Sequence, residues 1–412
     1  MQTNLAAFIK DTPEGREADA ILRKCVHCGF CTATCPTYQL LGDELDGPRG
    51  RIYLIKEVLE GAAPTAQTQL HLDRCLECRS CETTCPSGVE YGRLLDIGRP
   101  IVEERVDRGA FDTLKRAALR TVIPNRALFS VLVGLARLVR PLLPAPLARK
   151  LPARRAPGIW PARTHARRML VLESCGQREG APDTNAAAAR VLDRLGIALA
   201  RVPQAGCCGA VAYHLNAQGD GLDAMRRNIN AWWPDIEAGA EAIVTTASGC
   251  GSMVKDYGHL LARDPAYAAK AARVSALAKD LLEIIEPEAE RLKALTPHPS
   301  PLTPHPAVAF HPPCTLQHGL QLKGRVEALL AGLGFTLAPV ANAHLCCGSA
   351  GTYSLTQPEL SQQLLTNKIA ALEAGAPIAI LTANIGCQLH LQSATGLPVR
   401  HWIEALDERL RS

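Results

Sequence analysis

Eight of the sixteen cysteines form two copies of one pattern near the start of the 412-residue chain. Each copy reads Cys-x2-Cys-x2-Cys-x3-Cys-Pro, and each cysteine of the second copy lies 50 residues (75 − 25) after its counterpart. The copies are Cys25, Cys28, Cys31 and Cys35 with Pro36, and Cys75, Cys78, Cys81 and Cys85 with Pro86. Because thiolates are ligands for soft metals, this duplicated stretch predicts two equivalent metal centres.

The even three-residue step between the cysteines favours iron–sulfur clusters. It is the spacing of bacterial two-cluster ferredoxins, in which the fourth cysteine of each run ligates the other cluster. Zinc sites instead use two short pairs separated by a longer loop, and disulfides fit poorly with a chain that shows no signal peptide. Zinc sites and disulfides are therefore the alternatives to two [4Fe–4S] clusters. For the clusters we expect these ligands: Cys25, Cys28, Cys31 and Cys85 on one, and Cys75, Cys78, Cys81 and Cys35 on the other.

A second duplicated set of cysteines follows in the last two thirds of the chain. It consists of Cys175, Cys207, Cys208 and Cys250 in one copy, and Cys314, Cys346, Cys347 and Cys387 in the other. Each adjacent pair precedes a glycine, which allows a backbone conformation that turns both sulfurs toward one centre. These eight residues are candidate ligands of a further iron–sulfur cluster, and the alternative is inert buried cysteine, which behaves as a small hydrophobic residue.

The elements around this second set repeat as well. Apolar strands are expected at residues 169–172, 197–199 and 242–246, and again at 307–310, 335–337 and 378–382, with helices between them. Alternating strands and helices predict a parallel α/β unit, so the sequence predicts two tandem copies. Loops at the carboxyl ends of parallel strands converge, and each group of cysteines occupies such loops.

The first cysteine region has helical rather than strand periodicity. Ala18, Ile21 and Leu22 share one helix face, and a helix beginning at Pro48 is expected to end at Gly61. The fold class is therefore α+β overall: a mainly helical N-terminal two-cluster ferredoxin domain, then two tandem parallel α/β cysteine-rich domains. The expected segments are 1–112 (helical domain), 113–167 (basic helix and linker), 168–295 (first α/β domain), 296–306 (Pro-rich spacer) and 307–412 (second α/β domain).

The net charge of +5 hides a strong asymmetry. Residues 113–172 carry thirteen Lys or Arg and no Asp or Glu, so the remainder of the chain is net −8 (5 − 13). Within this stretch, the apolar residues from Leu128 to Val139, flanked by Arg126, Arg137 and Arg140, predict a basic amphipathic helix that ends before Pro141. Such a helix can lie on an anionic membrane or on another subunit. Internal packing is the alternative, whereas nucleic acid fits poorly because stacking residues and binding motifs are lacking. No run of eighteen uncharged apolar residues exists, so no membrane span is expected.

Other charged or histidine residues near the cysteines give weaker indications of function. Four arginines near the first cysteines are expected to be surface charges rather than groups that tune a cluster potential: Arg49, Arg51, Arg74 and Arg79. Three histidines near the second set are expected to be hydrogen-bonded structural residues: His311, His344 and His390. No flavin or nicotinamide fingerprint follows a strand, and no Ser/His/Asp constellation exists. We therefore expect that this chain alone does not oxidise an organic substrate.

Two cubane motifs followed by two Cys…Cys-Cys-Gly…Cys units resemble the iron–sulfur subunits of respiratory 2-hydroxy-acid and glycerol-3-phosphate dehydrogenases. The same cysteine-rich domain occurs in heterodisulfide reductases. Within this group the chain most resembles the iron–sulfur subunits of bacterial glycolate oxidase (glycolate dehydrogenase), and the resemblance is carried by residues 26–55, 205–210, 246–251, 344–353 and 382–387. It departs from the heterodisulfide reductases at Met253 and His390, where their pattern has a further cysteine.

The resemblance implies an electron-transfer role. FAD-containing partner subunits would oxidise glycolate to glyoxylate, and this chain would carry the electrons singly to quinone or another respiratory acceptor. It implies a cytoplasmic location, peripheral on the inner face of the cytoplasmic membrane. The alternatives are a catalytic heterodisulfide-reductase-like subunit, and the same relay serving lactate or glycerol-3-phosphate.

Overall fold

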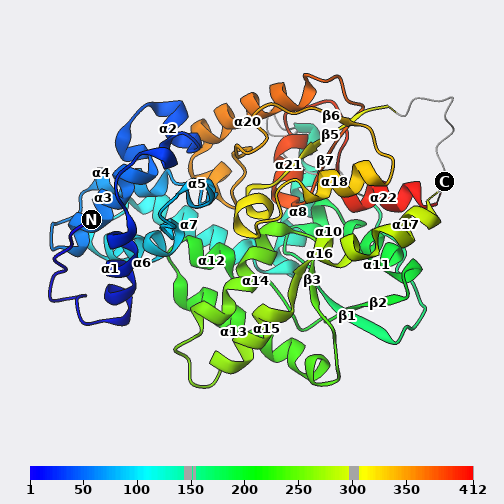
Figure 1. Cartoon of the computed structure of the whole chain (residues 1–412), viewed down its shortest axis with the longest axis horizontal. Helices are drawn as coiled ribbons and strands as arrows, with labels where there is room; N and C mark the ends of the chain where they lie inside the picture. The colour runs from blue at the N-terminus through cyan, green and yellow to red at the C-terminus, as the bar shows by residue number, and fades with distance from the viewer. Residues whose placement is uncertain (143–150, 152–154, 297–305, 412) are drawn as a thin grey trace. The chain divides into compact units, whose positions relative to one another are not determined.

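The computed structural model describes residues 1–142, 151, 155–296 and 306–411, and it forms two compact units (Figure 1). The first unit comprises Met1–Ala117 and His344–Leu364, and the second comprises Ala118–Ala343 and Leu365–Ser412. The predicted Pro-rich spacer lies almost wholly outside the described residues, as does part of the predicted linker. The division into five segments stays a prediction.

The first unit is built from short helices around a small apolar core. Helices α1, α3 and α6 pack together through Leu22, Ile55 and Leu94, which are fully buried. Local sequence sets their starts: Thr12 accepts a hydrogen bond from Gly15 N, and Pro13 and Pro48 open α1 and α3. The elements are α1 (Pro13–Lys24), η1 (Phe30–Thr32), α2 (Pro36–Leu41), η2 (Glu44–Asp46), α3 (Pro48–Leu59), α4 (Ala66–Asp73), α5 (Ser80–Thr84), α6 (Tyr91–Arg105) and α19 (Tyr353–Thr356). Two further helices, α7 (Ala110–Val122) and α20 (Pro358–Glu373), cross from one unit to the other.

The second unit contains two four-stranded parallel sheets with the same topology. The first has the order β2-β1-β3-β4 and the second has the order β6-β5-β7-β8. The strands are β1 (Arg167–Leu172), β2 (Ile197–Arg201), β3 (Ile243–Thr245), β4 (Ala278–Asp280), β5 (Val308–His311), β6 (Leu337–Ala338), β7 (Ala379–Thr382) and β8 (Val399–His401). This repeated order confirms the predicted parallel α/β duplication and adds a fourth strand to each sheet.

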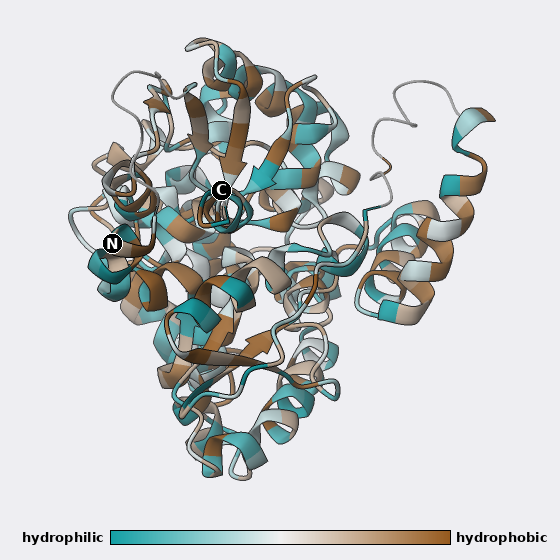
Figure 2. Cartoon of the chain, turned by 90° about the vertical axis from the view of Figure 1, so that its right-hand side faces the viewer, coloured by the Kyte–Doolittle hydropathy of each residue, from teal (hydrophilic) through white to brown (hydrophobic). Residues whose placement is uncertain are grey.

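Apolar strands and helices of both sheets share one core. Val171 from β1, Phe310 from β5 and Trp402 from α22 belong to the same buried cluster, and most strand residues are hydrophobic (Figure 2). The helices of this unit are α8 (Arg126–Leu138), η3 (Arg140–Leu142), α10 (Gln177–Gly180), α11 (Thr184–Arg194), α12 (Ala210–His214), α13 (Gln218–Glu237), α14 (Ser248–Leu260), α15 (Ala268–Leu277), α16 (Leu281–Ile285), η4 (Glu286–Glu288), α17 (Ala289–Leu295), η5 (Thr315–Gly319), α18 (Arg325–Gly332), α21 (Ile385–Gln392) and α22 (Trp402–Arg409).

Helix α8 lies within the stretch for which a basic amphipathic helix was predicted. Its arginines pair with the protein itself: Arg126 donates to the carbonyl oxygen of Glu173 at 2.7 Å, and Arg137 lies 2.8 Å from the Glu179 carboxylate. Because Val133 on the same side is buried, the opposite side exposes an apolar stripe. This α8 stripe consists of Val131, Leu132, Leu135 and Leu138.

Among the described residues, no single helix has the length and apolar composition to cross a membrane. The bent pair formed by α7 and α8 meets those criteria only when the two helices are taken together.

Candidate metal centres

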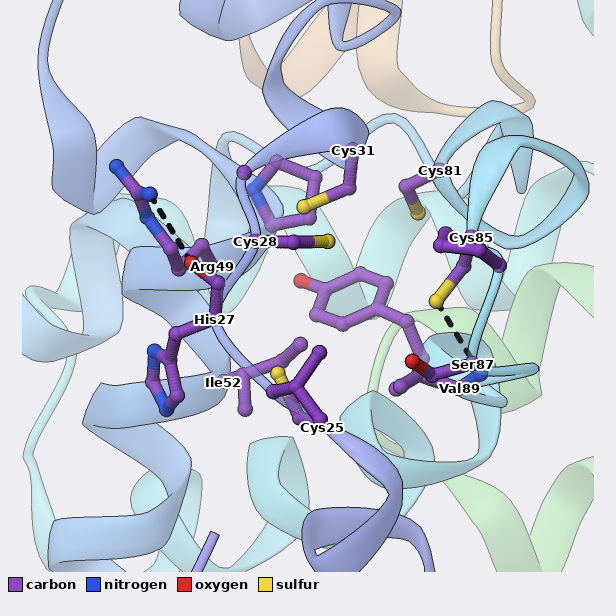
Figure 3. Close-up of a pocket in the computed structure, with 15 residues that line it drawn as sticks. Cys25, His27, Cys28, Cys31, Arg49, Ile52, Cys81, Cys85, Ser87 and Val89 are labelled. Atoms are coloured by element: carbon purple, nitrogen blue, oxygen red, sulfur yellow. Dashed lines mark hydrogen bonds between the residues drawn. The ribbon is translucent and has the colours of Figure 1, made fainter.

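The first cysteine site is a cavity in the helical unit that brings distant residues together. Figure 3 shows Cys25, Cys28, Cys31, Cys81 and Cys85 around it. Ile52, Val89 and Tyr91 line the same cavity, so its wall is largely apolar. Cys28 is exposed, whereas Cys25 is buried. The cavity therefore combines thiols from both copies of the motif and has one edge at the surface.

The backbone between these cysteines explains how closely spaced thiols can face one centre. In the first copy His27 and Gly29 have positive φ (55° and 86°), and in the second Glu77 and Arg79 do (53° and 56°). These left-handed residues lie on both sides of the second cysteine of each copy, Cys28 and Cys78, and turn the chain sharply there. The duplication seen in the sequence is thus a duplication of backbone conformation.

Cys35, Cys75, Cys78 and Cys81 form the second group in this unit. Cys35 and Cys75 are electrostatic neighbours of both Cys78 and Cys81. Burial raises the pKa of the Cys78 and Cys81 thiols, and it raises that of Cys31 to about 11. A bound metal would favour the deprotonated form of these thiols.

A buried ionic network lies beside this second group, and it corrects one expectation. Arg51, expected at the surface, is 1% exposed; its Nε donates to the carbonyl oxygen of His71 at 2.7 Å. Its Nη2 lies 3.5 Å from the carboxylate of Asp46, and Asp46 also pairs with Arg74 at 2.8 Å. Arg51 also lies in the electrostatic field of Cys35 and Cys75. The expectation of a surface arginine was wrong because helix periodicity does not reveal that a buried carboxylate, Asp46, lies beside Arg51.

Sequence reasoning missed a second buried arginine, Arg99. It is 8% exposed and donates to the carbonyl oxygens of Leu72 (2.7 Å) and Cys75 (3.2 Å). It also pairs with Glu77. Its position on α6, about two turns after Tyr91, offered no signal beyond an arginine within an apolar helix.

The first copy of the later cysteine set is a four-thiol cluster at the strand ends of the first sheet. Cys175 follows β1, Cys207 and Cys208 follow β2, and Cys250 lies in the first turn of α14 after β3. Hydrogen bonds link the side chains in series: Cys175 with Cys207, Cys207 with Cys208, and Cys208 with Cys250. Bonds from Cys175 and Cys208 lower the pKa of Cys207, while the pKa values of those two donors are raised.

The Cys-Cys-Gly turn of this cluster is held from both sides. Gly209 has φ of 94°, and a Cβ there would lie 2.7 Å from the carbonyl oxygen of Gly221. Asn228, fully buried, donates to the carbonyl oxygen of Cys207 at 2.9 Å, and Tyr257 donates to that of Cys208 at 2.8 Å. Only glycine fits the turn, and the turn directs two adjacent sulfurs to one place.

The second copy of this set is divided between the two compact units. Cys314 and Cys387 belong to the second unit, whereas Cys346 and Cys347 belong to the first. In the first unit Cys346 is an electrostatic neighbour of Cys78, and Tyr353 donates to the carbonyl oxygen of Arg74 at 3.1 Å.

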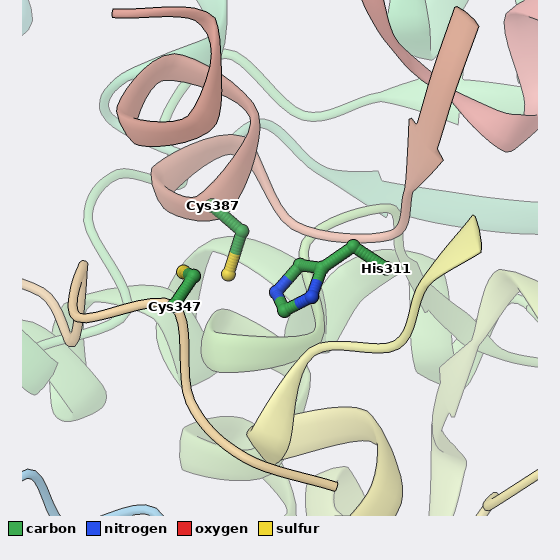
Figure 4. Close-up of side chains that lie close together, drawn as sticks. All are labelled: His311, Cys347 and Cys387. Carbon is green, nitrogen blue, oxygen red and sulfur yellow. The ribbon is translucent and has the colours of Figure 1, made fainter. Parts of the chain in front are cut away.

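His311 corrects a second expectation. It was predicted to be a hydrogen-bonded structural histidine, but neither ring nitrogen has a hydrogen-bond partner among the described residues. A ring nitrogen instead lies within 4.8 Å of Cys387 Sγ (Figure 4). For His344 and His390 the expectation stays a prediction.

Comparison with known proteins identifies these sites as family features. A 4Fe-4S dicluster domain matches residues 21–89, and a cysteine-rich domain matches residues 169–255 and 308–392. The chain is 57% identical over 411 residues to the glycolate oxidase iron–sulfur subunit of Escherichia coli, covering 100% of this chain and 99% of that protein. The chain belongs to the family of glycolate oxidase iron–sulfur subunits.

Other relatives match the chain at lower similarity. A probable glycolate oxidase iron–sulfur subunit of Bacillus subtilis is 31% identical over 405 residues, which is 90% of this chain and 88% of the relative. Lactate utilization protein A of Geobacillus kaustophilus is 28% identical over 229 residues, covering 54% of this chain and 91% of that protein.

The donor sets fit what this family of iron–sulfur subunits requires. The helical unit supplies eight thiols in two groups, and several of these thiols are buried and have raised pKa values. Backbone amides also face sulfur: Glu77 N lies 3.4 Å from Cys75 Sγ, and Val89 N lies 3.5 Å from Cys85 Sγ. Amide hydrogen bonds to ligand sulfur stabilise the negative charge of a bound iron–sulfur cluster.

Proposed function

We propose that this chain is the electron-transfer subunit of a glycolate-oxidising complex. It would receive electrons from FAD-containing subunits that convert glycolate to glyoxylate, and pass them to quinone or another respiratory acceptor. The main observation in support is that the helical unit brings thiols from both copies of the motif together, with Cys85 lining the same cavity as Cys25 and Cys28. Two redox groups held by one small rigid unit suit the transfer of single electrons from a two-electron flavin.

The proposed ligand sets follow the motif and the neighbours described above. One [4Fe–4S] cluster would be held by Cys25, Cys28, Cys31 and Cys85, and the other by Cys75, Cys78, Cys81 and Cys35. A further cluster would be held by Cys175, Cys207, Cys208 and Cys250, whose hydrogen-bonded series supports it. Sequence duplication alone extends the same proposal to Cys314, Cys346, Cys347 and Cys387. When bound, these clusters would supply reversible one-electron chemistry.

The residues of the chain would control this chemistry through environment. The apolar wall around Cys25 and Cys31 excludes water from most of the first site, while exposed Cys28 leaves one edge accessible to a donor. Arg51 and Arg99 place fixed positive charge near Cys75, which favours extra negative charge at the second site. This difference supports electron entry at the first site and storage at the second.

The test is a chain with Cys28→Ser in the assembled complex. We expect glycolate-to-quinone electron flow to be lost, while the flavoprotein still reduces an artificial dye with glycolate. Iron analysis shows whether the later cysteines also hold a cluster. About eight irons per chain fit the two clusters of the helical unit alone, and about twelve or more require the later cysteines. Unchanged quinone-linked activity would reject the relay.

A second candidate is the same relay serving another 2-hydroxy acid, which the similarity to lactate utilization protein A favours. The iron–sulfur absorption of the anaerobically purified complex distinguishes the two. Bleaching by glycolate but not by lactate or glycerol-3-phosphate supports the glycolate assignment. Absence of bleaching by glycolate, in a preparation that contains flavoprotein and is bleached by dithionite, rejects it.

We further propose peripheral contact with the cytoplasmic membrane surface through the α8 stripe. Because Arg126 and Arg137 pair with Glu173 and Glu179, the contact would be driven by apolar insertion and would depend weakly on salt. Leu135→Asp should abolish cosedimentation of the complex with phospholipid vesicles, whereas Leu355→Asp, at an exposed leucine of the first unit, should not. Equal sedimentation of both variants and the original chain would reject membrane contact by α8.

A further inference from the structure

The two cysteine-rich repeats differ at the last residue of their first strand. In the first sheet Leu172 ends β1 and pairs with Thr245 of β3. In the second sheet His311 ends β5 and pairs with Thr382 of β7. The equivalent positions therefore hold a leucine in one repeat and a histidine in the other, three residues before Cys175 and Cys314 respectively.

His311 occupies an environment that ordinarily excludes an unpartnered imidazole. It is 1% exposed, and neither ring nitrogen has a hydrogen-bond partner among the described residues. Leaving a buried polar group unpaired destabilises the folded chain. A leucine at this position, as in the first repeat, would avoid that cost, so the histidine requires a ligand as its explanation.

The thiol of Cys387 indicates where a metal bound by His311 would lie. Figure 4 shows the imidazole of His311 and the sulfur of Cys387, at the start of α21, directed toward the same space. The nearest ligand atoms of the two residues lie within 4.8 Å, close enough for both to bind one metal centre. Cys347, also drawn there, belongs to the first compact unit.

A carboxylate accompanies the histidine in the second repeat only. Glu327 on α18 lies in the electrostatic field of His311, and its Oε2 is buried without a partner among the described residues. Counting back by the offset of 139 between Cys175 and Cys314 (314 − 175) gives Ala188 on α11, which is fully buried. Histidines that bind metals commonly have a carboxylate near their other nitrogen, and the first repeat has neither group at these positions.

Another buried histidine of the same unit shows the ordinary alternative. His401 is 2% exposed, but its Nε2 lies 2.8 Å from the carbonyl oxygen of Thr246 and its Nδ1 accepts from Ile403 N at 3.1 Å. Both ring nitrogens of His401 are therefore used by the backbone. It provides a matched comparison for His311.

We propose that His311 is a nitrogen ligand of the metal centre of the second cysteine-rich repeat, beside Cys387. The first repeat, with Leu172 at that position, offers thiolates alone. This inference rests on the proposed further cluster, because it assigns a ligand to a centre that the proposed function includes. Mixed nitrogen and sulfur ligation lowers the negative charge of an iron–sulfur centre and raises its potential.

The test uses the full chain, purified anaerobically with its partner subunits and labelled with ¹⁵N-histidine. Pulsed EPR in the oxidised and dithionite-reduced states should detect a ¹⁵N coupling severalfold larger than the coupling of backbone amides. His311→Leu should lose this coupling. His311→Cys should lose it too while keeping the iron content, and its extra centre should have a lower midpoint potential. His401→Gln should leave the coupling unchanged.

The outcomes separate this inference from the proposed function. About twelve or more irons per chain with no large histidine coupling would overturn the role of His311 and leave the further cluster intact. About eight irons would remove the further cluster itself, and the inference with it. If His311→Leu fails to accumulate, the labelled original chain and His311→Cys still decide the question.

Discussion

Arg51 and Arg99 place two guanidinium groups in the helical unit, where isolated charge is costly. Arg51 is compensated by Asp46 and by the carbonyl oxygen of His71, and Arg99 by Glu77 and two backbone carbonyls. Both lie in the field of Cys75, whose thiolate adds negative charge on metal binding. Buried cations at this place stabilise the reduced form of a nearby cluster more than the oxidised form.

Replacement of Arg51 by Gln should therefore lower the midpoint potential of one cluster. At an effective dielectric constant of about 20, a neighbouring unit charge contributes a few kcal/mol, or on the order of 100 mV for one electron. EPR-monitored redox titration measures this shift. Arg51→Lys, which keeps the charge, should shift it much less.

The matched control is Arg49→Gln. Arg49 is only half-buried and is neutralised at the surface by Glu44. Its removal should change either potential by a small fraction of the Arg51 effect. Equal shifts in both variants would assign the effect to general loss of charge rather than to the buried position.

A buried carboxyl makes stability depend on pH in the second unit. Burial raises the pKa of Asp280, at the end of β4, from 3.8 to about 7. The unfolded chain ionises this group at lower pH than the folded chain does. Stability from this residue is thus complete below pH 3.8 and is lost as pH rises toward 7.

Asp280→Asn should remove that loss while keeping the N-cap bond from Leu282 N, which Asn also accepts. We expect the variant to gain stability relative to the original chain at pH 8 but not at pH 4, by at most about 4 kcal/mol. Thermal unfolding of the intact protein at both pH values measures this. An equal gain at both would refute the pH argument.

Much of the residue-level chemistry could be predicted because cysteine spacing is explicit in the sequence. The thiol groups of the helical unit and the strand-end positions of Cys175 and Cys250 followed from spacing and periodicity. Arg51, Arg99 and His311 could not be predicted, since their roles depend on which partner lies inside the fold. A buried arginine and a surface arginine have the same local pattern.

At the scale of elements, the strand-to-helix turns decide whether the later cysteines converge. The three predicted strands of each repeat are present, whereas β4 and β8 were missed. Each of these has only three residues, and such short strands lack measurable alternation. The predicted basic helix is present as α8, but Arg126 and Arg137 face the protein rather than an external surface, whereas Arg140 is exposed.

Gly209→Ala tests the Cys-Cys-Gly turn. The positive φ and the 2.7 Å approach to the carbonyl oxygen of Gly221 should cost about 1–3 kcal/mol and displace the adjacent thiols. We expect the loss of about four irons per chain, with unchanged EPR signals from the two clusters of the helical unit. Gly219→Ala is the control, because its added Cβ would contact no other group within 4 Å. Retention of all iron in Gly209→Ala would show that this turn holds no cluster.

At the scale of the molecule, a subunit that transfers electrons must offer a surface near a redox site. Val26 (67% exposed) and Phe30 (59%) are exposed apolar residues on either side of exposed Cys28 in the sequence, and Val26 lines the first cavity. Nearby charges are paired with each other, as Lys24 is with Glu90. Exposed apolar side chains beside Cys28 suit a stable contact with the electron-donating subunit that we propose.

Phe30→Asp should slow reduction of the iron–sulfur centres by glycolate at least tenfold, because it places a charge in this contact. Reduction by dithionite and the iron content should not change. Phe111→Asp, at an even more exposed phenylalanine of α7, is the control. Stopped-flow bleaching measures both rates, and equal rates in the two variants would place the donor elsewhere.

The first compact unit is completed by residues 344–364, and 226 residues (344 − 117 − 1) separate its two parts. During translation at roughly 5–20 residues per second, this closing segment leaves the ribosome about 12–50 s after Ala117. Tyr353, which binds the carbonyl oxygen of Arg74, arrives only then. For most of the time that the chain takes to be made, the helical unit therefore lacks the segment that carries Cys346, an electrostatic neighbour of Cys78.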